Sequence, residues 1–132
     1  MRLEISTDYA IRILRLLHTR NDEMLTAMEI AQATDTTSPV FTKIANQLRR
    51  GGMLKTIQGR YGGYVLGKPA REISIYDVYL CIEGALRLNH CLETGELCEH
   101  GEQVSCKVHG LLHGIQDDLI EKLNNVSIAD LA

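Results

Sequence analysis

The chain has 132 residues, of which 45% are hydrophobic and 23% are charged, and its formal net charge at pH 7 is −3. A chain of this length holds one domain with a modest core, or a small domain with an oligomerisation element. No uncharged stretch approaches the roughly 18 residues of a transmembrane helix, and the polar start, with Arg2, Glu4 and Asp8, does not resemble a signal peptide. We therefore expect a cytoplasmic protein without a membrane partner, in which thiols stay reduced.

The charge is unevenly distributed along the chain. Residues 36–71 contain no Asp or Glu, so all 17 acidic residues lie outside this segment. Such a local basic segment in an acidic protein indicates a surface for a polyanion, with a solvated basic face as the alternative. The basic residues of the segment are Lys43, Arg49, Arg50, Lys55, Arg60, Lys68 and Arg71.

Two helices are predicted before the basic segment. The first spans residues 6–18, with Ser6 or Thr7 as its N-cap. Its apolar residues recur at helical spacing: Ala10, Ile13, Leu14 and Leu17. The second begins after Thr26, which can form a capping box with Glu29, and it ends before the turn "TDTTSP".

A third helix is predicted over residues 38–50, with Ser38 as its N-cap, Pro39 at its first position and Gly51 or Gly52 at its C-terminal end. One face is apolar and consists of Phe41, Ile44, Ala45 and Leu48. Two short helices joined by a tight turn, the second polar and basic outside, are typical of a helix-turn-helix. A helical hairpin in an ordinary α-domain is the alternative.

The next stretch, "MLKTIQGRYGGYVLG", predicts a strand, a glycine-rich turn and a second strand, with Arg60 at the tip. A hairpin directly after a recognition helix is a wing, and the basic segment covers both elements. We therefore predict a mostly α fold with a small β-hairpin wing, a winged helix-turn-helix domain that binds double-stranded DNA.

The polar side chains of the third helix and the hairpin are the candidate DNA contacts. One group is suited to bases or nearby phosphates and consists of Ser38, Thr42, Lys43 and Asn46. A second group would mainly neutralise phosphates and consists of Arg49, Arg50, Lys55 and Arg60.

A fourth helix is predicted to run to about Leu86, with Cys81 inside it as a small core residue. A fifth runs from about Cys106 to Asn124 and carries an apolar stripe too long for so small a domain to cover. The stripe predicts a homodimer, with packing against the first helix as the alternative. Its residues are Val108, Leu111, Leu112, Ile115, Leu119 and Leu123.

A polar segment rich in cysteine precedes this last helix. Cys91, Cys98 and Cys106 fall within 16 residues, and His109 follows them. In a reducing compartment, clustered cysteines more often bind metal or sense redox state than form structural disulfides. We divide the chain into a DNA-binding domain (1–88), a cysteine-rich loop (89–106), and a dimerisation helix with its tail (107–132).

The segments "STDYAIRIL", "KIANQLRRGG", "GRYGGYVLGKPA" and "EISIYDV", followed by three cysteines and a terminal "ADL", resemble the Rrf-type winged-helix transcription regulators. The resemblance covers nearly the whole chain. In the IscR-like, NsrR-like and RirA-like branches, three cysteines between the winged domain and the dimerisation helix hold an iron–sulfur cluster. The resemblance implies the same role for Cys91, Cys98 and Cys106.

The resemblance offers two fourth ligands. IscR-like members use a histidine three residues beyond the last cysteine, which His109 matches, and NsrR-like members use an early aspartate of the other subunit, which Asp8 matches. The gaps of six and seven residues between the cysteines exceed the spacing of the IscR-like pattern. Both the cluster type, [2Fe–2S] or [4Fe–4S], and the fourth ligand therefore stay open.

We read the chain as a regulator, with repression as its expected mode, whose affinity for a pseudo-palindromic operator depends on a cluster that senses iron, nitric oxide or redox state. The alternative is a metal-free or zinc-bound winged-helix regulator, switched by thiol oxidation or a small molecule. An enzyme lacks support, because no general base, pocket motif or phosphate loop accompanies the cysteines.

Overall fold

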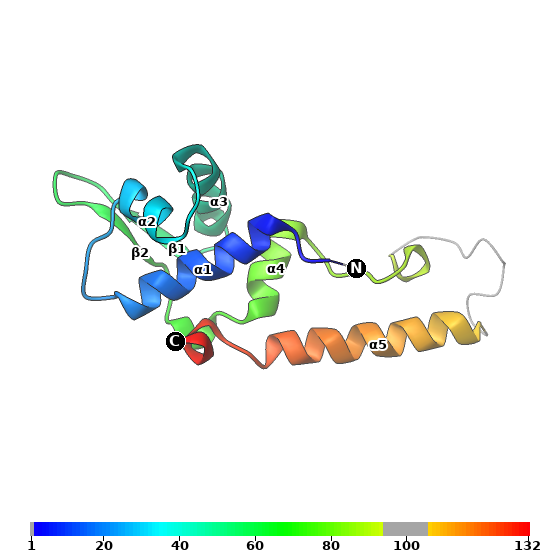
Figure 1. The fold of residues 1–132 in the computed structure, drawn as a ribbon. Helices are drawn as coiled ribbons and strands as arrows, with labels where there is room; N and C mark the ends of the chain where they lie inside the picture. The colour runs from blue at the N-terminus through cyan, green and yellow to red at the C-terminus, as the bar shows by residue number, and fades with distance from the viewer. Residues whose placement is uncertain (1, 94–105) are drawn as a thin grey trace.

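The computed structural model describes residues 2–93 and 106–132. The first part of the chain forms α1 (Ile5–Thr19), α2 (Ala27–Ala33), α3 (Ser38–Arg50), β1 (Leu54–Ile57) and β2 (Gly63–Leu66). The second part forms η1 (Ala70–Glu72), α4 (Ile75–Glu83), η2 (His90–Leu92), α5 (Lys107–Asn124) and η3 (Ile128–Leu131). Figure 1 shows α2 and α3 on one side of α1 and η3 on the other. The predicted winged helix-turn-helix fold is confirmed.

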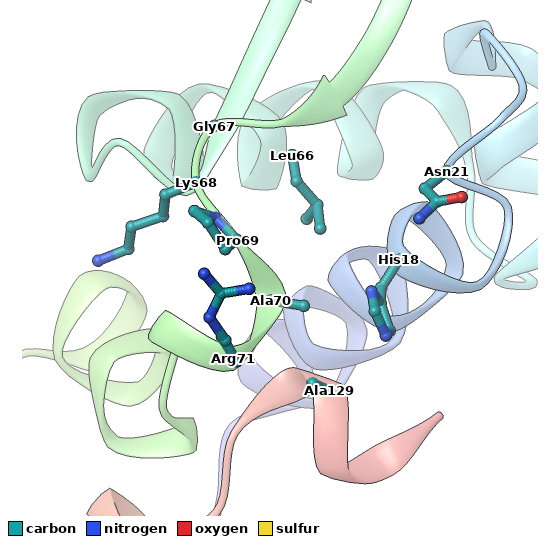
Figure 2. Close-up of a pocket in the computed structure, with 9 residues that line it drawn as sticks. All are labelled: His18, Asn21, Leu66, Gly67, Lys68, Pro69, Ala70, Arg71 and Ala129. Carbon is teal, nitrogen blue, oxygen red and sulfur yellow. The ribbon is translucent and has the colours of Figure 1, made fainter.

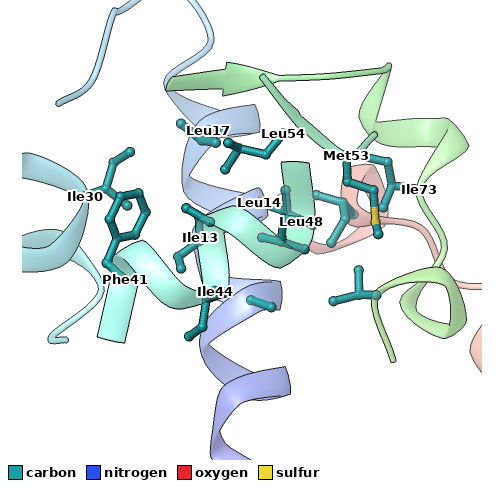
Figure 3. Close-up of a cluster of buried hydrophobic side chains, with 14 of the residues drawn as sticks. Ile13, Leu14, Leu17, Ile30, Phe41, Ile44, Leu48, Met53, Leu54 and Ile73 are labelled. Atoms are coloured by element: carbon teal, nitrogen blue, oxygen red, sulfur yellow. The ribbon is translucent and has the colours of Figure 1, made fainter. Parts of the chain in front are cut away.

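The core of the winged domain forms where α1, α2 and α3 meet (Figure 3). Ile13 and Leu14 of α1 and Phe41 of α3 have no exposed surface. The Phe41 ring also packs edge-on against the ring of Tyr64 on β2, with their centroids 5.1 Å apart. These contacts fix α3 against both α1 and the wing.

The wing is a two-stranded antiparallel hairpin in which Leu54 pairs with Leu66 and Ile57 with Gly63. Its turn depends on glycine at two positions. Gly59 has a φ of +110°, which side chains other than glycine rarely adopt, and a Cβ at Gly62 would lie 1.9 Å from the carbonyl oxygen of Ile57. The glycine-rich turn of the sequence is therefore required by the backbone.

Two expected helix caps are wrong. Helix α1 starts at Ile5 without a side-chain cap, and the expected cap Thr7 is instead a buried residue of the helix, whose hydroxyl donates to the Glu83 carboxylate of α4. A buried hydroxyl needs such a partner, and α4 supplies it. At α3 the cap is Thr37 rather than Ser38, because Thr37 is extended and its hydroxyl accepts from the backbone N–H of Val40, 3.4 Å away.

The other helix boundaries follow the sequence closely, with one further correction. Thr26 caps α2 as predicted, accepting from the backbone N–H of Glu29 at 3.3 Å, but the predicted capping box is incomplete, because the Glu29 carboxylate accepts from the Thr26 hydroxyl at 3.0 Å and not from the Thr26 backbone N–H. Helix α4 ends at Glu83 rather than near Leu86, because Gly84 has a φ of +87° that breaks the helix. The chain beyond the break still packs inward, and Leu86 is 2% exposed.

Helix α5 extends away from the winged domain, but the tail behind it returns to that domain (Figure 1). The backbone N–H of Ile75 donates to the carbonyl of Val126, and that of Ile128 donates to the carbonyl of Ile73, both at 2.9 Å. The Ile128 side chain is fully buried in the core. The C-terminal end of α5 is therefore fixed to the winged domain. Among the described helices, none has the length and apolar character needed to cross a lipid bilayer.

Replacing Phe41 by Ala is expected to lower the free energy of unfolding by about 3–5 kcal/mol, because the ring fills the core at the junction of α3 and the wing. The matched control is Val40→Ala on the adjacent, 41% exposed position, which should cost less than about 1 kcal/mol. Urea unfolding followed by circular dichroism measures both. Equal losses for the two variants would contradict this assignment of the core.

Candidate DNA interface and cysteine site

The exposed face of α3 follows from the burial of its other face. Phe41, Ile44, Ala45 and Leu48 are all buried, and helical periodicity turns the polar residues between them outward. All the predicted contact residues of α3 are exposed: Ser38, Thr42, Lys43, Asn46, Arg49 and Arg50. The helix thus presents a polar surface with three positive charges.

The positive charges of this surface are not neutralised within the described chain. None of Lys43, Arg49, Arg50 or Lys55 forms an ion pair among residues 2–93 and 106–132. Of the hydroxyl groups, that of Thr42 donates to the carbonyl of its own helix at position 38, with an oxygen–oxygen distance of 2.9 Å. The basic side chains are therefore available to an external anion.

The wing adds two of the predicted residues and one that sequence reasoning did not assign. Lys55 on β1 and Arg60 in the turn are exposed. The Arg60 guanidinium lies 5.6 Å from the ring centroid of Tyr61, which is itself 83% exposed. Stacking on an aromatic ring holds a cationic side chain at the tip of the hairpin. The position of Tyr61 in the sequence, an aromatic residue between the glycines of the turn, could have indicated that it belongs to the interface.

The structure places two of the three predicted cysteine ligands on packed elements. Cys91 lies in η2 and Cys106 is the N-cap of α5, and both thiols are free and half-buried. Cys98 lies outside the described residues. Helix α5 packs against η2. Just before η2, the Leu88 backbone N–H donates a hydrogen bond of 2.9 Å to Oε1 of Gln116 on α5, which is only 5% exposed.

Each of the two sulfur atoms accepts a hydrogen bond from a nearby N–H group. The Asn89 side-chain amide donates to Sγ of Cys91, and the His109 backbone N–H donates to Sγ of Cys106, both at 3.5 Å. Donors of this kind stabilise negative charge on sulfur. Sequence reasoning missed Asn89 and Gln116, because neither residue type is distinctive without the fold.

The two candidate fourth ligands differ in their surroundings. The Nδ1 atom of His109 is buried and has no hydrogen-bond partner among the described residues. Its ring stacks on that of His113 at a centroid distance of 6.0 Å, and Nδ1 of His113 lies 3.2 Å from a carboxylate oxygen of Asp117. Asp8, by contrast, is half-exposed and pairs with Arg12 one turn along α1 at 3.1 Å.

No group of three His, Cys, Asp or Glu side chains within residues 2–93 and 106–132 is arranged to hold a metal ion. The predicted set of Cys91, Cys98 and Cys106 includes one residue outside these ranges. The described residues supply two free thiols on contacting elements, Cys91 and Cys106, and the imidazole nitrogen of His109, which has no partner among them. These groups are compatible with a sulfur-rich metal site.

The fourth cysteine belongs to a different environment. Cys81 packs against the core and its thiol donates to the backbone carbonyl of Gln47 at 3.1 Å. Burial raises the pKa of the Cys81 thiol above its ordinary value, with an opposing contribution from the Gly51 backbone. Cys81 is thus a core-associated residue, as predicted, and is separate from the cysteine segment.

Because its pKa is raised, Cys81 carries less thiolate near neutral pH, and we expect iodoacetamide to alkylate it more slowly than Cys91 in the reduced, metal-free protein. Peptide mass spectrometry after timed quenching measures the two rates. Unfolding in urea serves as the control and should bring the rates together. Faster native alkylation of Cys81 than of Cys91 would contradict the burial of its thiol.

Comparisons with known proteins agree with this architecture. The Rrf2 family model, described as "Iron-dependent Transcriptional regulator", matches residues 3–132. The protein aau3 of Rhizobium meliloti (strain 1021) is 33% identical over 132 residues, which cover 99% of this chain and 84% of that protein.

Solved structures show the same fold. IscR of T. potens has a TM-score of 0.78 at 18% identity, with 99% of this chain and 85% of that chain covered. CymR of B. subtilis, described as a global cysteine regulator, has a TM-score of 0.78 at 25% identity, with 100% and 96% covered. The chain belongs to the Rrf2 family of winged-helix, DNA-binding transcriptional regulators, which are not enzymes.

Proposed function

We propose that this chain is a homodimeric regulator, acting as a repressor, whose operator affinity is controlled by an iron–sulfur cluster held by Cys91, Cys98 and Cys106. The observation that carries the proposal is the placement of Cys91 and Cys106 on two contacting elements, η2 and the start of α5. The chain between them supplies the third thiol. The signal would be iron supply, nitric oxide or redox state.

The environment of the two sulfur atoms supports ligation of a cluster. Cys106 lies at the N-terminal end of an 18-residue helix, where the helix dipole favours a negatively charged group. The N–H groups of Asn89 and His109 point at the two sulfurs, and such hydrogen bonds tune the reduction potential of a bound cluster. Iron–sulfur clusters supply one-electron chemistry and sensitivity to oxidants when bound.

His109 is the better supported fourth ligand. A buried imidazole nitrogen without a partner is costly, and a bond to iron would satisfy it. Asp8 already has a cationic partner in Arg12, although this exposed pair is weak. A single nitrogen ligand beside three thiolates gives the cluster one weaker bond to the protein. Such a cluster is lost more easily, which suits a sensor.

Hydrogen bonds join the end of α4, just before the cysteine segment, to the start of α1. Glu83, the last residue of α4, accepts hydrogen bonds from the Thr7 hydroxyl and from the Glu4 backbone N–H, the latter at 3.4 Å. Gly84 follows at once and leads to the segment that carries Cys91. Since α1 packs directly against α3, a shift of this segment would reach the recognition helix through the start of α1.

Dimerisation through α5 is supported by its exposed apolar side chains. Val108 is 61%, Leu111 62% and Ile115 47% exposed in the single chain. Large apolar side chains in a row on one helix face favour packing against a second copy. A dimer would present two α3 helices to successive major grooves of a pseudo-palindrome, about one helical turn apart.

A regulator that switches without a metal, through thiol oxidation or a small ligand, is the competing function. The fold does not separate the two, since IscR of T. potens and the cysteine regulator CymR of B. subtilis match it at the same TM-score of 0.78. Whether the cysteine site holds an iron–sulfur cluster, another metal or no metal decides between the two functions.

Replacing Arg60 by Ala is expected to weaken binding to all duplexes about equally and to reduce the slope of log K against log salt by about 1, because a phosphate contact is lost. Fluorescence anisotropy at several salt concentrations measures both. The control is Arg20→Ala at the far end of α1, where the guanidinium pairs with Glu23. An unchanged affinity and slope for Arg60→Ala would remove the wing from the interface.

Protein purified without oxygen is expected to contain iron and acid-labile sulfide in matched amounts, with the visible absorption of an iron–sulfur cluster. Replacing Cys91 or Cys106 by Ser should lower both to background, because a thiolate ligand is lost. Cys81→Ala is the matched control and should retain the cluster. Zinc alone, or no metal after reconstitution, would rule out cluster sensing and favour the thiol or ligand switch.

The same measurement tests the fourth ligand. His109→Ala should lose its visible absorption faster under air than the unmodified protein, whereas Asp8→Ala should lose it at the unmodified rate. The reverse order would assign the fourth position to Asp8.

A further inference from the structure

A second basic site lies at the base of the wing and is not part of the DNA interface described above. It is a pocket of about 610 Å³ formed by the chain leaving β2, by η1, by the end of α1 and by η3 (Figure 2). Arg71 lies on one side of it and Lys68 lies at the rim, with its ammonium group pointing outward; His18 and Asn21 lie across from Arg71. The pocket is a depression that is open to solvent.

The charge of the pocket is positive and unpaired. No Asp or Glu lines it, and within the described ranges neither Lys68 nor Arg71 forms an ion pair or a side-chain hydrogen bond. The C-terminal end of α1 contributes a partial negative charge of about half a unit. The two full positive charges exceed it, so the pocket attracts anions.

These two cations are the members of the basic segment that the DNA interface does not use. The other five lie on α3 and the hairpin, whereas the pocket includes η3, which packs on the side of α1 away from α3 (Figure 1). A duplex bound to α3 and the wing tip would not need to contact this pocket. Lys68 and Arg71 are therefore available to an anion other than the duplex.

The lining indicates the kind of anion. Between the polar groups the surface is apolar, formed by Leu66, Pro69, Ala70 and Ala129. A guanidinium offers paired N–H donors that match the oxygens of a phosphate or carboxylate. Such a site suits a small organic molecule that has one anionic group and an apolar remainder.

We propose that this pocket binds a small organic anion, a phosphate ester or a carboxylate, through Arg71 and Lys68, with His18 and Asn21 on its other side. Because Leu66 is the last residue of β2 and His18 belongs to α1, the bound anion would bridge the base of the wing and α1. The site is independent of the cysteine segment.

The test is a titration of the ¹⁵N-labelled full chain with phenyl phosphate and with benzoate, followed by ¹H–¹⁵N spectra. At least one of the two probes should give saturable shifts at the amides of Asn21, Gly67 and Arg71, with a Kd on the order of 1 mM. Benzyl alcohol, which is similar in size but neutral, should give no saturable shift. Equal binding of benzyl alcohol, or no saturation by either anion at about tenfold higher concentration, would overturn the proposal.

Charge-removing variants test the assigned residues. Arg71→Gln and Lys68→Gln should each weaken anion binding about tenfold, because a charge-assisted hydrogen bond is lost. Arg60→Gln at the wing tip is the matched control and should bind the anion as the unmodified chain does. Both pocket substitutions are at side chains on the surface, and the spectra themselves report whether the fold is kept. Unchanged binding by Arg71→Gln would overturn the assignment.

DNA binding by the same variants tests whether Arg71 and Lys68 contact the phosphates of DNA instead of a small anion. Arg71→Gln should keep the DNA affinity within about twofold and leave the salt slope unchanged. A loss of affinity and slope like that expected for Arg60→Ala would place Arg71 in the DNA interface and overturn the small-anion site.

Discussion

Helix α1 runs through the middle of the molecule and packs against α2, α3, α4, β2, η1 and η3. Its inward side chains, among them Ile13 and Leu14, are fully buried, and the Thr7 hydroxyl is held by Glu83. Interiors are close-packed, so elements around one helix respond to each other's positions. The recognition helix, the wing and the entrance to the cysteine segment all take their positions from this helix.

The charges of the protein are distributed in a way that fits DNA binding. On α3 and the wing the exposed charged residues are all basic, whereas elsewhere basic and acidic residues are mixed, as on α5, where Lys107 and Lys122 accompany Asp117, Asp118 and Glu121. A duplex is thus attracted to α3 and the wing, which orients the chain during encounter. The net charge of −3 conceals this local surface because it averages over the whole chain.

Local patterns predicted the helices, the hairpin and the exposed contact residues, because periodicity and turn chemistry act over a few neighbouring residues. The cap of α3 and the end of α4 were missed by one to three residues for local reasons, at Thr37 and Gly84, whereas the error at Thr7 arose because a distant segment competes with a local one. Thr7 could serve as a cap by sequence, but α4 offers its hydroxyl a buried partner. The Leu88–Gln116 bond and the pocket at Arg71 join residues far apart in the chain, so no local pattern could reveal them.

The tail that returns to the winged domain determines how α5 can move. Its C-terminal end is fixed by Ile128 in the core, while Cys106 lies at the opposite end, about 27 Å away along the helix axis. A tilt of about 5° at the fixed end would move the far end by about 2 Å, together with η2, which packs against α5. Bonds at a metal site tolerate only about 0.2 Å, so ligation at Cys106 would restrict α5 to a narrow range of angles.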